Sequence, residues 1–201
     1  MPRPDHLDAA GWAVLEAAGV RTLVDLRNDD EIAALPLRPA TIDTVVCSIE
    51  DPSDVEFMAE LDAFLGSPTY YAENLRRWPQ KIAAAITAVA DAPAGGVVIH
   101  CAAGRDRTGL IVALLLHFAG IDRAAILDDY EAGVRETNAY LRGLDDPHER
   151  PRTDEELESG IHSARRTLDE LLENLDVSTY LLRAGMSASQ LNTLRTRLLG
   201  A

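Results

Sequence analysis

The sequence is poor in features that would each indicate a particular class of protein. Only two cysteines occur in 201 residues, Cys47 and Cys101, which argues against a disulfide-stabilised secreted domain and favours a reducing compartment. The longest apolar run, residues 110–116, is far shorter than the ~20 residues of a membrane-spanning helix. The first twelve residues contain no apolar core of a signal peptide. We therefore predict a cytoplasmic protein without membrane insertion.

Positive charge is scarce as well. The chain has 33 Asp and Glu residues against 19 Lys and Arg, a net charge of -14. This excess repels a phosphate backbone, so nucleic acid is not an expected partner. Apolar residues make up 47% of the chain, which is enough to form a hydrophobic core and argues against disorder. The length predicts one domain that covers residues 1–201.

Short runs of strand-forming residues alternate with helical patterns, which predicts an α/β protein. We expect strands at 20–26, 41–48 and 96–101. The last is apolar without alternation and is predicted to be a central strand buried on both faces. Helices are expected from about residue 54 to 65, from residue 67 onward, and after Pro79. Residues 110–118 predict a buried helix, and the C-terminal third is predicted to be helical throughout.

The most informative segment is HCAAGRDRTG, residues 100–109, between a predicted buried strand and a predicted buried helix. A loop at this place directs backbone N–H groups toward an oxyanion at the positive end of the helix dipole. The segment therefore predicts a phosphate-binding loop. Its predicted phosphate-binding residues are Ala102, Ala103, Gly104, Arg105, Asp106 and Arg107.

Several residues of this segment have chemistry that fits a nucleophilic site. Cys101 is the predicted nucleophile, because N–H groups, a helix end and an arginine favour the thiolate. Arg107 supplies a planar fork for two phosphate oxygens. Thr108 is expected to hydrogen-bond the sulfur and later ease its departure. Gly104 can adopt angles that a Cβ forbids, and Gly109 is expected to let helix and strand approach closely.

Residues around this segment are expected to support it without contacting substrate. His100 is expected to order the loop by hydrogen bonds, since a thiolate needs no base. Asp25, Arg27 and Glu31 are interpreted as a structural ion pair that holds the first strand to its helix. Tyr70 and Tyr71 are interpreted as packing residues at a helix start.

The pattern of HC, five residues, then Arg and Thr resembles the signature of the cysteine-dependent phosphatases. Its extended form HCxAGKDRTG is similar to the bacterial tyrosine phosphatase family that includes mycobacterial secreted phosphatases with phosphotyrosine and phosphoinositide activity. Arg105 stands where that family has Lys. The similarity extends to GVRTLVDLRNDDE at 19–31 and DDY at 128–130. The resemblance implies a cysteine-phosphatase fold, with a small mixed sheet flanked by helices. It also implies a phosphocysteine intermediate and neither cofactor nor metal.

Two departures from the family pattern are visible. The family's FRDLGG-like segment before the first helix has no counterpart here, which predicts either a misplaced start or an abbreviated sheet. Only about twenty residues separate Asp51 from Tyr71, so we expect an open or lightly gated site in place of a longer lid.

The reaction implied by the resemblance needs an acid for the leaving oxygen and then a base for water. Asp51 is our first candidate, because it follows the strand 41–48 and aligns with the acid-bearing loop of the family. Asp106, inside the phosphate-binding loop, is the second, and Asp54 is the third.

The expected substrate is a phosphotyrosine protein. A phosphoinositide or dual-specificity phosphatase is the alternative, because Arg105 gives the loop a second cation for a multiply phosphorylated ring. A sulfur transferase shares the strand–Cys–loop–helix arrangement but does not need the Arg107 fork. A phosphopeptide-binding pseudo-phosphatase is disfavoured by the intact Cys101. The sequence leaves the oligomeric state open.

Overall fold

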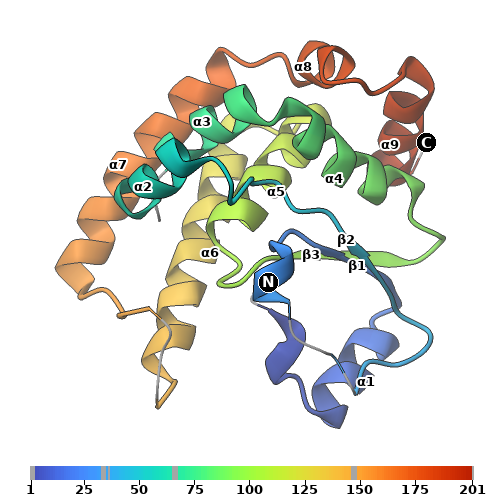
Figure 1. Cartoon of the computed structure of the whole chain (residues 1–201), viewed down its shortest axis with the longest axis horizontal. Coiled ribbons are helices and arrows are strands. Elements are labelled where there is room, and N and C mark those ends of the chain that lie inside the picture. Colours follow the sequence, from blue (N-terminus) through green and yellow to red (C-terminus); the bar gives the residue numbers. More distant parts are fainter. Residues whose placement is uncertain (1–2, 33–34, 36, 65–67, 146–148, 201) are drawn as a thin grey trace.

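The computed structural model describes residues 3–32, 35, 37–64, 68–145 and 149–200. Its sheet contains β1 (Val20–Asp25), β2 (Asp43–Val46) and β3 (Gly96–His100). These strands lie where strands were predicted, in the order β2-β1-β3. They are the centre of an α/β fold with a small sheet flanked by helices, as the sequence predicted (Figure 1).

Two details of the predicted sheet were wrong. Among the described strands β1 is central and β3 lies at an edge, because only β1 pairs on both sides. Leu23 and Val24 of β1 are fully buried, whereas β3 is only partly buried before His100. Both pairings are also parallel, not mixed, since the crossover from β2 to β3 runs through helices and returns in the same direction.

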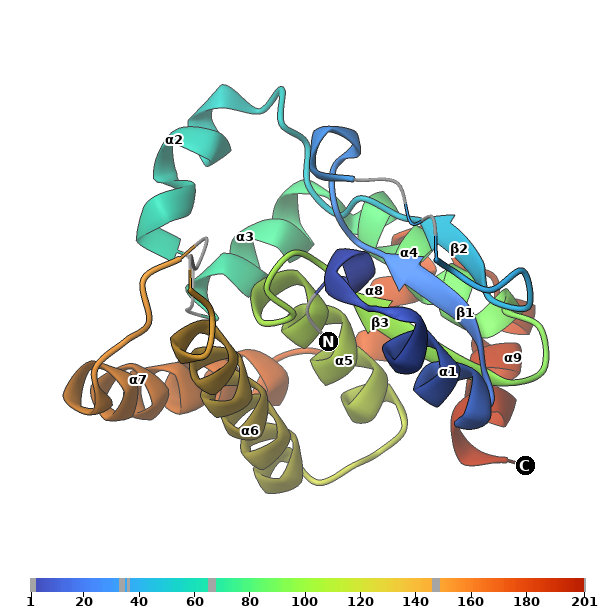
Figure 2. The ribbon, with the colours of Figure 1, turned by 90° about the horizontal axis from the view of Figure 1, so that it is seen from below.

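Helices cover the two faces of the sheet (Figures 1 and 2). The helix α1 (Ala9–Ala17) lies on one face, where Trp12 packs with Leu23 and Ile42 in a small core. On the other face lie α4 (Pro79–Asp91) and α5 (Asp106–Phe118). The larger hydrophobic core is formed there. The sheet therefore lies between two apolar layers.

Two helices separate β2 from α4. They are α2 (Val55–Phe64) and α3 (Thr69–Arg77). Figure 2 shows α2 projecting from the body of the molecule beside α3. The predicted helix positions Leu65 and Ser67 lie outside the described residues.

The C-terminal third is helical, as predicted. It consists of α6 (Arg123–Arg142), α7 (Asp154–Glu173), α8 (Val177–Arg183) and α9 (Ala188–Leu199). Capping boxes begin α7 at Thr153 and α9 at Ser187. α6 packs against both α5 and α7, and α9 packs against α4. These helices cover the side of α4 and α5 that faces away from the sheet.

No helix in the described ranges combines the length and the apolar character needed to cross a membrane.

Candidate active site

The loop between β3 and α5 is built around Cys101. Gly104 adopts φ 79°, a left-handed conformation that a side chain would strain. This turn lets the N–H of Gly104 donate to the sulfur of Cys101 at 3.3 Å. The Thr108 hydroxyl donates to the same sulfur, also at 3.3 Å. Both donors stabilise a thiolate at the first turn of α5, where the helix dipole is positive.

Gly109 has a different packing role from the one expected. A Cβ at this position would collide with the hydroxyl of Tyr71 on α3. The close approach that this glycine permits is therefore between α5 and α3, not between α5 and a strand. Tyr71 is itself almost fully buried, in agreement with its predicted packing role.

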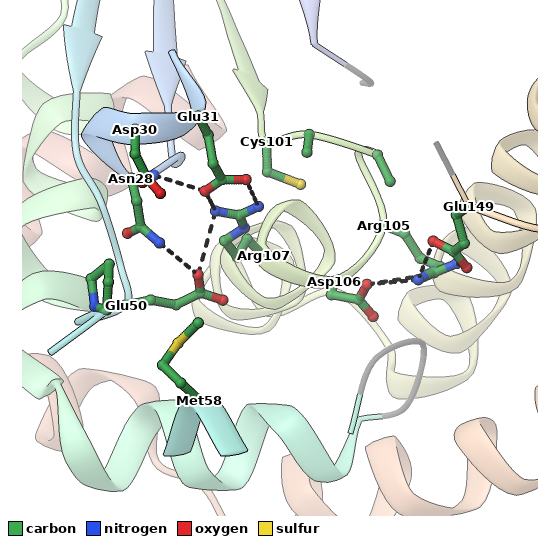
Figure 3. Close-up of a pocket in the computed structure, with 13 residues that line it drawn as sticks. Asn28, Asp30, Glu31, Glu50, Met58, Cys101, Arg105, Asp106, Arg107 and Glu149 are labelled. Atoms are coloured by element: carbon green, nitrogen blue, oxygen red, sulfur yellow. Dashed lines mark hydrogen bonds and ion pairs between the residues drawn. The ribbon is translucent and has the colours of Figure 1, made fainter. Parts of the chain in front are cut away.

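Cys101 lies at a cavity of about 310 Å³, which is large enough for a phosphoryl group and part of its ester (Figure 3). The cavity lies at the carboxyl ends of the parallel strands, where open α/β sheets bind ligands. It is lined by Asn28, Asp30, Glu31, Glu50, Pro52, Met58, Cys101, Ala102, Ala103, Arg105, Asp106, Arg107 and Glu149. In the described ranges, no three His, Cys, Asp or Glu side chains form a group that could hold a metal ion.

Arg107 is held by two carboxylates, and we call Arg107, Glu31 and Glu50 the inner cluster. Glu31 accepts from Nη1 at 2.5 Å and from Nη2 at 2.7 Å. Glu50 lies 3.4 Å from Nη1. A guanidinium has five N–H donors. Glu31 occupies one N–H of Nη1 and one of Nη2, so the other edge, formed by Nε–H and the remaining N–H of Nη2, can bind two phosphate oxygens. Glu31 and Glu50 thus fix the plane of Arg107 beside Cys101.

Glu50 is itself fixed by neighbouring polar groups. The Tyr70 hydroxyl and the Asn28 amide donate to its carboxylate, and the Ser48 hydroxyl donates to Asn28 Oδ1 at 2.5 Å. Burial and the negative charge of Glu50 raise the pKa of Tyr70 well above its usual value. Tyr70 therefore stays protonated and remains a donor.

The charges of the inner cluster reinforce one another. Burial raises the pKa of Glu31, but the hydrogen bonds and positive charge of Arg107 outweigh it, so the net pKa is lowered. Burial also opposes the charge of Arg107, yet Glu31 and Glu50 raise the pKa of its guanidinium. Glu31 and Arg107 are therefore both charged at neutral pH.

Arg105 points to the opposite side of the loop, and we call Arg105, Asp106 and Glu149 the outer cluster (Figure 3). Its Nε and Nη2 donate to Asp106 Oδ2 at 3.1 and 3.0 Å. Its Nη1 and Nη2 donate to the two oxygens of Glu149 at 2.8 and 3.1 Å. Every nitrogen of the Arg105 guanidinium is thus engaged by a carboxylate.

The three candidate acids occupy different environments. Asp106 is the first residue of α5, is mostly buried and lines the cavity. Asp51 accepts from the N–H and hydroxyl of Ser53 at 2.9 and 2.7 Å, and these hydrogen bonds lower its pKa. Asp54 accepts from the N–H of Phe57 at the start of α2 and from Arg77. Within the described chain, Asp106 alone of the three belongs to the cavity lining.

Asp25 and Arg27 form a buried ion pair at the end of β1. Arg27 donates to both oxygens of Asp25, at 2.9 and 2.8 Å, and to Asp5 at 2.7 Å. Asp5 belongs to a short 3-10 helix, Pro4–His6, at the N-terminal end. The pair therefore ties the end of β1 to this N-terminal segment, and Arg27 Nη1 also donates, at 3.3 Å, to the Glu31 carbonyl in the short 3-10 helix Asp29–Glu31 that follows the strand. The Glu31 side chain joins Arg107 instead.

The same N-terminal segment contacts the phosphate-binding loop directly, because the N–H of Arg3 donates to the carbonyl of Ala102 at 3.0 Å. His100, at the end of β3, is fully buried, with Nδ1 at 3.4 Å from the Cys101 carbonyl oxygen. Burial lowers the pKa of His100, so its ring is neutral at pH 7. This placement is consistent with the predicted ordering role.

The sequence interpretation missed three carboxylates of the cavity lining, Asp30, Glu50 and Glu149. Glu50 follows β2 directly, so the position that suggested Asp51 could also have suggested its neighbour. Glu149 gave no such signal, because it stands in a polar connection between α6 and α7, 44 residues from Arg105. Only the packing of α6 beside α5 brings it to the cavity.

The chain matches the family model described as the tyrosine phosphatase family over residues 2–200. It is 30% identical to the triple specificity protein phosphatase PtpB of Mycobacterium tuberculosis, over an alignment of 244 positions. That alignment covers 97% of this chain and 88% of the relative.

Two further relatives match a smaller share. A tyrosine-protein phosphatase of Nostoc commune is 30% identical over 69% of this chain and 47% of its own length. The dual specificity protein phosphatase TpbA of Pseudomonas aeruginosa is 26% identical over 69% of this chain and 56% of its own length.

Proposed function

The chain belongs to the tyrosine phosphatase family and is a protein-tyrosine phosphatase, and from this premise we propose that it works through a phosphocysteine formed on Cys101. One observation carries the proposal. The Cys101 sulfur accepts hydrogen bonds from Gly104 and Thr108 at the positive end of α5, and Arg107 lines the same cavity.

In the first step the thiolate of Cys101 attacks phosphorus, and the bond between phosphorus and the tyrosyl oxygen breaks. The loop N–H groups and the Nε edge of Arg107 bind the phosphoryl oxygens, most strongly as these oxygens spread in the transition state. Asp106 donates a proton to the departing oxygen. We favour Asp106 over Asp51 because Asp106 lines the cavity beside Cys101, whereas Asp51 is not among the lining residues.

In the second step water attacks the phosphocysteine and the phosphorus–sulfur bond breaks. The Asp106 carboxylate accepts a proton from the water, in the reverse of its first role. The Thr108 hydroxyl, already 3.3 Å from the sulfur, stabilises the departing thiolate. The products are inorganic phosphate and the free enzyme.

We propose phosphotyrosine proteins as substrates. Pro52 and Met58 give the cavity an apolar side that an aromatic ring can contact, while Cys101 and Arg107 receive the phosphate. A dual-specificity or phosphoinositide phosphatase is the second candidate, favoured by a second cation, Arg105, in the loop. Cytoplasmic location and the absence of a nucleic-acid partner stay predictions from the sequence.

The intermediate itself gives the sharpest test. We expect wild-type protein, quenched in acid during turnover of a phosphotyrosine peptide, to carry one phosphoryl group on Cys101 by mass spectrometry. Cys101→Ser should bind the peptide but form neither intermediate nor product, because its hydroxyl stays un-ionised. Cys47→Ser, which changes the other cysteine of the chain, is the matched control. Sustained turnover by Cys101→Ser would refute the mechanism.

A further inference from the structure

The outer cluster contains the one loop cation that could bind a second phosphate near the reacting one. Arg105 lines the cavity, and its side chain is only 5% exposed. A free guanidinium at this place would bind an additional phosphate through charge-assisted hydrogen bonds. Its actual partners therefore decide whether the cavity favours or disfavours substrates with neighbouring phosphates.

Those partners are two carboxylates. Asp106 engages Nε and Nη2, and Glu149 engages Nη1 and Nη2 with both of its oxygens. Two carboxyl groups thus face one guanidinium and occupy all three of its nitrogens. A second phosphate at this side would lose the cation and meet an acidic group.

The two carboxylates differ in how they are held. Asp106 is the first residue of α5 and adjoins Arg105 in the chain, so its contact with the guanidinium is a local one. Glu149 comes from the connection between α6 and α7, and its side chain is 34% exposed. It is the member of the outer cluster whose removal leaves the loop and α5 intact.

We propose that Glu149 is a specificity-determining residue that occupies Arg105 and thereby disfavours substrates with a second phosphate beside the scissile one. The inference rests on the proposed function and narrows it to singly phosphorylated tyrosine. Removing the charge of Glu149 releases the Nη1 donor and one of the two N–H donors of Nη2. Arg105 can then bind the second phosphate.

The test compares two peptides that are identical except for one group. One carries a single phosphotyrosine, and the other carries the same phosphotyrosine with a phosphothreonine two residues away. The ratio of kcat/KM for tyrosine dephosphorylation, doubly over singly phosphorylated, is measured for each protein. Gaining or losing one charge-assisted hydrogen bond changes an equilibrium constant about tenfold. Glu149→Gln should therefore raise the kcat/KM ratio, doubly over singly phosphorylated peptide, about tenfold.

Two variants serve as controls. Glu155→Gln removes one negative charge from an exposed position in the first turn of α7 and should leave the ratio unchanged. In Glu149→Gln/Arg105→Met the second phosphate has no cation to bind, so the gain should disappear. The two peptides are also compared by binding to inactive proteins. The ratio of their affinities should change between Cys101→Ser and Cys101→Ser/Glu149→Gln by the same factor.

An unchanged ratio in Glu149→Gln would overturn the proposal. A gain that persists in the double variant would overturn it too, since Arg105 would then not be the subsite. Neither result would contradict the proposed function. That function fails only if wild-type protein does not hydrolyse the singly phosphorylated peptide through Cys101.

Discussion

The two ends of the phosphate-binding loop hold their arginines in different ways. At the inner cluster, Arg107 contacts Glu31 and Glu50 from the segments after β1 and β2, and Glu50 is buried and supported by Tyr70 and Asn28. At the outer cluster, the long-range partner is Glu149, which is one-third exposed. The inner arginine thus has long-range partners from two segments, one of them the buried Glu50, whereas the outer arginine has its neighbour Asp106 and one long-range partner on a surface connection.

This difference indicates a division of roles. A group that must be ready for the transition state benefits from being held before substrate arrives. A group that selects among substrates can be held by a residue that changes without disturbing the fold. We therefore propose that the inner cluster serves catalysis and that the outer cluster selects among substrates. Asp106 is the exception, because it belongs to the outer cluster and is also the proposed general acid.

The largest expected effect tests the role of Asp106 as the general acid. Asp106→Asn should slow hydrolysis of a phenyl phosphate by about 10² to 10⁴, as is typical for loss of a general acid. The kcat/KM of an activated aryl phosphate, which reports the steps up to formation of the phosphocysteine, should be hardly affected, because its leaving group needs no proton. Steady-state kinetics over a series of leaving groups measures this.

Asp51→Asn is the matched control and should show no dependence on the leaving group. If Asp51→Asn instead shows that dependence and Asp106→Asn does not, the proton comes from the loop after β2.

The next effect compares the two arginines directly. Arg107→Lys should lower kcat by about 10² to 10³ with little change in KM, since Lys keeps the charge but loses the fork that binds the transition state. Arg105→Lys, the same change at the outer end, should lower kcat less than tenfold on a singly phosphorylated substrate. Equal losses in the two variants would contradict the division of roles.

A smaller effect concerns the support of the inner cluster. Tyr70→Phe removes the donor to buried Glu50 and should lower the free energy of unfolding by about 1 to 3 kcal/mol. Tyr71→Phe is the natural control, because the Tyr71 hydroxyl is equally buried but has no hydrogen-bond partner within the described residues. Urea denaturation compares the two. Equal destabilisation would mean that the Tyr70–Glu50 hydrogen bond contributes nothing specific.

The smallest effect is a dependence of stability on pH. The pKa of Glu31 is lowered in the folded protein from 4.5, so its contribution is fully present above about pH 4.5. The contribution is lost as pH falls through the lower folded value. Glu31→Gln should cost at most about 1 kcal/mol at pH 7, and the difference from wild type should vanish in acid.

Thermal denaturation at pH 7 and below pH 4.5 measures this change. Glu155→Gln, at an exposed site, is the control for removal of one carboxylate. A difference from wild type that stays constant across this pH range would rule out the Glu31–Arg107 pair as its source.

The amino-acid order was sufficient to predict the features that depend on local chemistry. The segment 100–109 contains the proposed nucleophile, the glycine with positive φ, the arginine fork and the threonine within eight residues, and this spacing predicts that they surround one anion. The strands near 20, 43 and 96 and the helical last third also followed from periodicity and capping residues. Such features depend on neighbours in the chain, and a sequence displays those neighbours directly.

The distant groups that complete the site could be identified only from the folded arrangement. Strand order made β1 central, because pairing on both sides is a property of the whole sheet and not of the apolar run in β3. The packing of α6 beside α5 brought Glu149 to Arg105. The carboxyl ends of parallel strands brought Glu31 and Glu50 to Arg107, and Asp5 met Arg27 across the end of β1. Carboxylates are abundant in so acidic a chain, so only their position in space distinguishes these few from the rest.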